Sequence, residues 1–290
     1  MWRVVYPRHE VEWDSRTMST EPSAPLVGVH PSVKQAIATW TEYSEKTEIL
    51  VHVTHEAFMR LQNVPEILET IYGALPGADH VGLARAQRSA DFAKLESEAG
   101  FPTLHAHSLI GIWGALECFI EDLFVAMLEA DASLLANPSF SKVKLPVAVV
   151  QASDRDRCRA ILQEAARAVD ADVAIGTTKF ERLLRMVDLG GEVPEAIKEA
   201  VFKSQQIRNV WAHRSGVADE RFVERCRDLG YEVGDKVNMN PAQFLRLMHG
   251  LHMYGVVIFN RVRKSIEREP LIVECVGYEG VLTSGDEGAP

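Results

Sequence analysis

The chain has little cysteine, with four residues among 290, and none of them lies close to another in sequence. They are Cys118, Cys158, Cys226 and Cys275. There is no Cys-x-x-Cys pair and no Cys/His cluster at the spacing of a zinc site. We therefore expect free thiols, as in a protein of a reducing compartment.

Long hydrophobic runs are also missing. The best one, 109–116, ends at Glu117 and is followed by Glu121 and Asp122, so it is too short and too charged to span a bilayer. The opening residues, MWRVVYPRHEVEWD, show no signal-peptide pattern, and Met18 offers an alternative start. These absences predict a cytoplasmic protein with no membrane partner.

An excess of positive charge and the sequence motifs of common enzymes are absent as well. The formal net charge is −10, and a negative chain does not bind nucleic acid through bulk charge. Any contact with RNA must therefore be local. The chain contains no GxxxxGK[ST], GxGxxG, GxSxG or HExxH. Its hydrophobic content of 47% is ordinary for a globular protein.

What the sequence does contain is helical periodicity along most of its length. Apolar residues recur at three- and four-residue intervals, and proline and glycine separate the periodic segments. We expect helices over 32–61, 65–75, 80–98, 102–130, 154–169, 178–189, 194–215 and 241–268. No internal repeat and no alternation of strands with helices is present, so the predicted fold class is all-α, a helical bundle.

The same periodicity predicts the domain organisation. Residues 1–31, rich in proline, serine and threonine, are expected to form a flexible N-terminal arm. Residues 32–100 form an N-terminal helical segment of unassigned role, and residues 101–270 form the larger helical domain. Residues 271–290 are a C-terminal extension: it favours β-structure at first, is too short for a sheet of its own, and ends in a loose acidic tail.

The segment KSQQIRNVWAHRSG concentrates polar side chains on an otherwise apolar helix. Gln205, Asn209 and His213 are four residues apart and share one face. Arg208 is five residues before His213, about 140° around the helix and ~7.5 Å along its axis. Gly216 is expected to be the first residue after the helix, which places His213 in the last turn. There the helix dipole favours an imidazolium that can donate a proton to a leaving group.

The pattern Arg208-Asn209-Val210-Trp211-Ala212-His213 resembles the Rx4-6H motif of HEPN domains, the higher eukaryote and prokaryote nucleotide-binding domains. A polar residue directly after the arginine is usual in that family, and Asn209 occupies this position. The earlier run IGIWGALECFIEDLF is similar to the family's leading helix, which often carries an acidic residue at a position like Glu117. The similarity covers roughly residues 102–268.

The resemblance implies a metal-independent endoribonuclease that needs no cofactor, acting as a toxin or phage-defence effector. Two subunits would pair as a homodimer so that both motifs line one cleft, and an antitoxin or other regulatory protein could be a partner. His213 would transfer protons and Arg208 would hold the phosphate, while Asn209 would orient the histidine or the substrate.

Other features of the sequence bear on this implied ribonuclease. The supporting or RNA-contacting residues would be Glu117, Gln205, Arg214 and Ser215. Residues 201–270 carry twelve Lys/Arg against eight Asp/Glu, a local charge of +4. Some HEPN toxins carry a tyrosine two places after the histidine, which a partner nucleotidyltransferase modifies. Ser215 occupies that position here, so silencing of this kind is not expected.

Structural interpretations of the same residues stay open. Arg208 could pair with a carboxylate such as Glu117, and His213 could be only a C-terminal capping residue. Trp211 fits a core or a dimer interface better than a base-stacking platform. The alternative function is then a non-catalytic helical interaction protein, binding RNA, a nucleotide or a toxin.

The remaining histidines and a group of arginines have simpler explanations. His249 and His252 could share a metal, but no third ligand is near in sequence, which favours a surface or core role. His105 and His107 are expected to be solvated near a helix start. The arginines between 155 and 167 are expected to form a solvated face, and secondarily a track for RNA phosphates.

Overall fold

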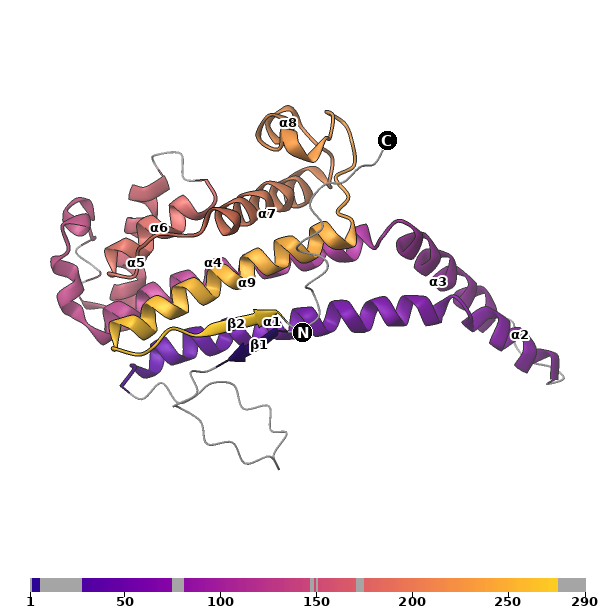
Figure 1. The fold of residues 1–290 in the computed structure, drawn as a ribbon, viewed down its shortest axis with the longest axis horizontal. Helices are drawn as coiled ribbons and strands as arrows, with labels where there is room; N and C mark the ends of the chain where they lie inside the picture. Colours follow the sequence, from indigo (N-terminus) through magenta and orange to yellow (C-terminus); the bar gives the residue numbers. More distant parts are fainter. Residues whose placement is uncertain are drawn as a thin grey trace, which may run out of the picture. The chain divides into compact units, whose positions relative to one another are not determined.

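A computed structural model describes residues 2–5, 28–74, 81–146, 149, 151–170 and 175–275. Helices dominate these ranges, which confirms the expected all-α class (Figure 1). The α-helices are α1 (Pro31–Leu61), α2 (Val64–Ala74), α3 (Val81–Glu98), α4 (Pro102–Ala130), α5 (Asp154–Asp170), α6 (Thr177–Met186), α7 (Glu195–Arg214), α8 (Glu220–Arg225) and α9 (Pro241–Ser265). Short 3-10 helices occupy Ala132–Ala136, Pro138–Lys142 and Arg227–Leu229. Among the described α-helices, α8 alone was not predicted from the sequence, because its six residues are too few to show a period.

Helix starts follow the local signals in the sequence. The Asn240 side chain accepts a hydrogen bond from the Gln243 backbone N–H at 2.8 Å, and the Gln243 side chain accepts one from the Asn240 N–H at 3.1 Å. This reciprocal cap, with Pro241 as the first residue of α9, fixes where the last helix begins. Helix α7 begins at Glu195, directly after the proline expected at its start.

Two short strands at opposite ends of the described chain pair with each other. Strands β1 (Trp2–Val5) and β2 (Ile272–Cys275) are antiparallel, with Trp2 opposite Cys275 and Val5 opposite Ile272. The β-favouring residues after 270 therefore find a partner strand far away in sequence. The rest of the expected flexible arm (6–27) and of the loose tail (276–290) lies outside the described residues.

The chain divides into two compact units that are discontinuous in sequence. The first contains residues 1–42, 114–205 and 249–290, and the second contains 43–113 and 206–248. Helices α1, α4, α7 and α9 each contribute one part to each unit. The domain boundaries expected from the sequence stay predictions.

Close helix contacts organise the core of the first unit. The rings of Trp40 on α1 and Phe119 on α4 stack with centroids 5.7 Å apart. Glycines on α9 allow the nearest approaches: a Cβ at Gly250 would lie 2.2 Å from the Ala200 Cβ on α7, and one at Gly255 would lie 2.2 Å from the Trp40 Nε1. Parts of α1, α4, α7 and α9 therefore pack together in this unit.

A buried ion pair joins α6 to α9 in the first unit. Arg261 donates from Nη1 to both carboxylate oxygens of Glu181, at 2.8 and 3.0 Å. Tyr254 donates its hydroxyl to Glu181 Oε1 at 2.8 Å, and the backbone N–H of Gly191 donates to Oε2 at 3.0 Å. The carboxylate thus has four hydrogen bonds, as a buried charge requires.

A histidine pair occupies the core of the second unit. His105 is fully buried, so the expectation that it is solvated was wrong, whereas His107 is exposed as expected. The His105 ring stacks on Phe244 of α9 at 4.2 Å, and its Nε2 lies 3.1 Å from Nε2 of His55 on α1. The residues that bury His105 come from distant parts of the chain, which its local sequence does not reveal.

Candidate functional site at the end of helix α7

Helix α7 ends in a turn with two consecutive left-handed residues. Its last helical residue is Arg214, followed by Ser215 at φ 52° and Gly216 at φ 79°. The Gly216 N–H donates to the Val210 carbonyl oxygen at 3.1 Å, which satisfies an acceptor of the last turn. The sequence predicted Gly216 as the first residue beyond the helix, but Ser215 takes this role.

Two backbone segments, one just after α7 and the other at residues 234–237, hydrogen-bond to each other beside this helix end. The backbone around Gly216 and Ala218 hydrogen-bonds with residues 234–237, including Val237 N–H to the Gly216 oxygen at 2.8 Å and Ala218 N–H to the Asp235 oxygen at 2.8 Å. Trp211 donates its indole N–H to the Val237 carbonyl oxygen at 2.8 Å. The last turn of α7 is therefore fixed to a segment more than twenty residues further along the chain.

Lys236 reinforces the same contact. Its ammonium group lies 4.4 Å from the centroid of the Trp211 ring and also donates a hydrogen bond to the Ser215 carbonyl oxygen. A Cβ at Gly216 would lie 2.9 Å from Trp211 Cε2, so the close packing requires glycine. Trp211 packs on its own helix cap, and its predicted role in a dimer interface stays a prediction.

Arg208 and Asn209 form a pair on the half-buried side of the helix. Arg208 Nη1 donates to Asn209 Oδ1 at 3.0 Å, so the amide oxygen orients the guanidinium. Orienting this group in advance matters for binding phosphate, because two parallel N–H donors must meet two phosphate oxygens. The role expected for Asn209, orienting the histidine or the substrate, stays a prediction.

His213 lies on the exposed side of the last turn. It makes no hydrogen bond or ion pair with any residue that the structure describes. Its neighbour Arg214 is also exposed and lies 3.6 Å from the Asp219 carboxylate, while the Ser215 side chain is exposed as well. The imidazole is thus accessible to a ligand on a helix end whose backbone is well fixed.

Two of the expected supporting residues lie in the first unit. Gln205 accepts a hydrogen bond from the Gly176 N–H at 2.8 Å, at the start of α6, which gives it a structural contact. Glu117 is half-buried on α4, where its charge helps to raise the pKa of Glu121, after the larger effect of burial. Its pairing with Arg208 stays a prediction.

The described residues offer no obvious metal site or reactive thiol. No three His, Cys, Asp or Glu side chains in these ranges gather as metal ligands would. Cys118, Cys158 and Cys226 carry free thiols, and burial raises the pKa of both Cys118 and Cys158, which disfavours the nucleophilic thiolate. No described helix has the length and apolar character needed to cross a membrane.

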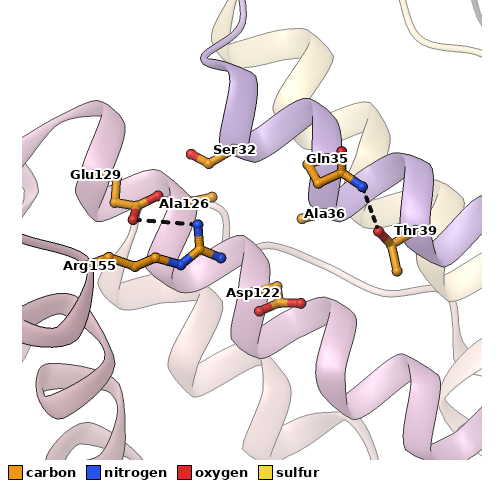
Figure 2. Close-up of a pocket in the computed structure, with 8 residues that line it drawn as sticks. All are labelled: Ser32, Gln35, Ala36, Thr39, Asp122, Ala126, Glu129 and Arg155. Carbon is orange, nitrogen blue, oxygen red and sulfur yellow. Dashed lines mark hydrogen bonds and ion pairs between the residues drawn. The ribbon is translucent and has the colours of Figure 1, made fainter.

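A small polar pocket in the first unit was not apparent from the sequence, because its walls come from three helices. Figure 2 shows α1 residues facing α4 residues, with Arg155 of α5 at one end. The lining residues are Ser32, Gln35, Ala36, Thr39, Asp122, Ala126, Glu129 and Arg155. Arg155 lies 3.9 Å from the Glu129 carboxylate, so this arginine of the expected solvated face has a carboxylate partner.

No protein-family model, curated protein or solved structure matches this chain.

Proposed function

We propose that the chain is a metal-independent endoribonuclease of the HEPN type, active as a homodimer. The observation that supports this most is the arrangement around the end of α7. An exposed imidazole, His213, and an oriented guanidinium, Arg208, occupy the last turns of one helix, and the Trp211 side chain and the backbone just after this helix are hydrogen-bonded to residues 234–237.

The chemistry needs proton transfer and a cation, both of which this pair supplies. The 2′-hydroxyl of a ribose attacks the adjacent phosphorus while a base removes its proton. The bond to the 5′-oxygen then breaks as an acid protonates that oxygen. The products are a 2′,3′-cyclic phosphate and a 5′-hydroxyl. A base must start without the proton and an acid with it, so two His213 side chains from two subunits would divide the base and acid roles.

Arg208 would neutralise the charge that builds on the phosphate oxygens during attack. Asn209 supports this role because its amide oxygen holds the guanidinium in place. Arg214 and Ser215 would contact neighbouring phosphates or riboses, since both are exposed beside His213. The biological role would be that of a toxin or phage-defence effector, with an antitoxin or other regulatory protein as partner.

The test is cleavage of a labelled RNA by the wild type and by His213→Ala, Arg208→Ala and the double variant. Each single change should reduce the rate by roughly 10²–10⁴-fold. The double variant should be scarcely slower, because both groups act in one step. Arg208→Lys should restore activity only in part, since it loses the planar fork. Activity should persist in EDTA.

Matched controls separate chemistry from folding. His107→Ala and Arg221→Ala remove an exposed histidine and an exposed arginine elsewhere in the chain, and both should cleave like the wild type. Thermal melts of the His213, His107 and Arg221 variants should stay close to that of the wild type, because these three side chains are exposed, and the half-buried Arg208 should cost only a little more. Wild-type cleavage by His213→Ala would refute the proposal.

One observation favours a second candidate, a non-catalytic helical interaction protein. Large apolar side chains are exposed on α1, α2 and α3, among them Ile49, Leu50 and Leu95, and such surfaces commonly mark protein contacts. Intact RNA after incubation with a folded wild-type protein would favour this alternative.

A further inference from the structure

Exposed apolar side chains concentrate on one part of the second unit. Thirteen large hydrophobic side chains are exposed among the described residues, and nine of them fall between Tyr43 and Leu95. At roughly 100 Å² each, these nine leave on the order of 900 Å² of apolar surface, divided among α1, α2 and α3. Exposed apolar side chains indicate a protein contact where they are contiguous, as they are along one face of a helix.

Four residues of α1 form one continuous face, which we call the α1 seam: Lys46, Ile49, Val53 and Glu56. Their spacing of three, four and three residues places them in line along the helix. All four are exposed, with Ile49 at 60% and Val53 at 55%. The seam therefore presents two apolar residues flanked by one positive and one negative residue.

The opposite face of the same helix is already occupied. Phe58 contacts the rings of Phe92 and Phe101, and His55 contacts His105, all within the second unit. Val51 is buried on that side as well. The helix is thus packed on one side, whereas the apolar side chains of the α1 seam are exposed on the other.

The charges along the seam are complementary to those of a second copy that runs in the opposite direction. If two copies of α1 cross antiparallel about a two-fold axis midway between Ile49 and Val53, Ile49 faces Val53 of the second copy. Lys46 then faces Glu56 of the second copy, and the symmetric contact repeats this pair. A parallel arrangement would instead place Lys46 on Lys46 and Glu56 on Glu56, which repel.

We infer that the α1 seam is an interface between two copies of this chain, packed antiparallel. Glu56 also lies 3.3 Å from Arg60 and 3.3 Å from His52 in its own chain, but such exposed pairs are weak and exchange at little cost. Leu50, 62% exposed beside the seam, adds apolar area. The interface is separate from the motif residues, so it does not depend on ribonuclease activity.

Charge reversal tests the inference, because Lys46 and Glu56 are about 15 Å apart along one helix and cannot pair within a chain. Lys46→Glu alone and Glu56→Lys alone should each raise the dissociation constant of the dimer on the order of tenfold, since two attractive contacts become repulsive. The two variants mixed together should associate like the wild type, because each then supplies the charge that the other needs. Sedimentation equilibrium over a concentration series measures all three.

Differently tagged copies give a second measurement. Heterodimers of Lys46→Glu with Glu56→Lys should exceed the random proportion, even if another surface also holds copies together. Glu69→Lys makes the same charge change on an exposed residue of α2 and should associate like the wild type. His213→Ala should also associate normally, which keeps this test distinct from the proposed catalysis. A monomeric wild type, or random pairing of the two reversed variants, would overturn the inference.

Discussion

The His55–His105 pair should make the protein unstable in mild acid. Burial is the main cause that lowers the pKa of His105 from 6.5 to about 4, and the nearby His55 lowers this pKa further. The Met239 carbonyl oxygen, 3.5 Å from Nδ1, acts in the opposite direction and raises it. Burial and the charge of His52 also lower the pKa of His55. Both rings are therefore neutral in the folded protein at neutral pH, and one Nε2–H donates a hydrogen bond to the other Nε2 across 3.1 Å.

The sign of the effect follows from proton counting. Below pH 6.5, His105 binds a proton in the unfolded chain but stays neutral in the folded protein. The free energy of unfolding therefore falls as the pH falls toward about 4. Between pH 7 and pH 5 this single group should cost about 2 kcal/mol of unfolding free energy. That amount is a substantial part of the stability of a typical domain.

Urea unfolding at pH 7, 6 and 5 measures the effect. His105→Phe keeps an aromatic ring against Phe244 but binds no proton, so its stability should fall less between pH 7 and 5 than that of the wild type, by about 2 kcal/mol. His107→Gln changes an exposed histidine two residues away and should follow the wild type. Equal pH dependence of the wild type and His105→Phe would show that the pair is not the source.

Further predictions concern the core of the first unit. Gly250→Ala places a methyl group against Ala200 and should destabilise the protein by about 1–3 kcal/mol in thermal or urea melts. Gly114→Ala, in a helix with nothing within 4 Å of the new Cβ, should stabilise the protein by about 0.5–1 kcal/mol. If Gly250→Ala and Gly114→Ala changed the unfolding free energy in the same direction, the packing argument would be wrong. Glu181→Gln leaves Arg261 without its charge partner and should cost about 3 kcal/mol or more, whereas an unchanged melt would mean that the pair contributes little.

Local signals in the sequence determined most of the helices. The helix expected over 102–130 is found at Pro102–Ala130, and the one expected to open at Pro241 begins there. Capping residues, proline and apolar spacing act within a few residues of one another, so a sequence alone carries their information. The position of Arg208 and His213 near the end of one helix was predictable for the same reason.

Contacts between residues distant in sequence were decided only by the tertiary structure. The pairing of β1 with β2 joins segments more than 260 residues apart, and the partners of His105 lie 50 residues before it and 139 residues after it. The support of Trp211 by Val237 and the contact of Gln205 with Gly176 were equally hidden. Such contacts depend on which faces of separate helices meet, and helical spacing specifies an apolar face without specifying its partner.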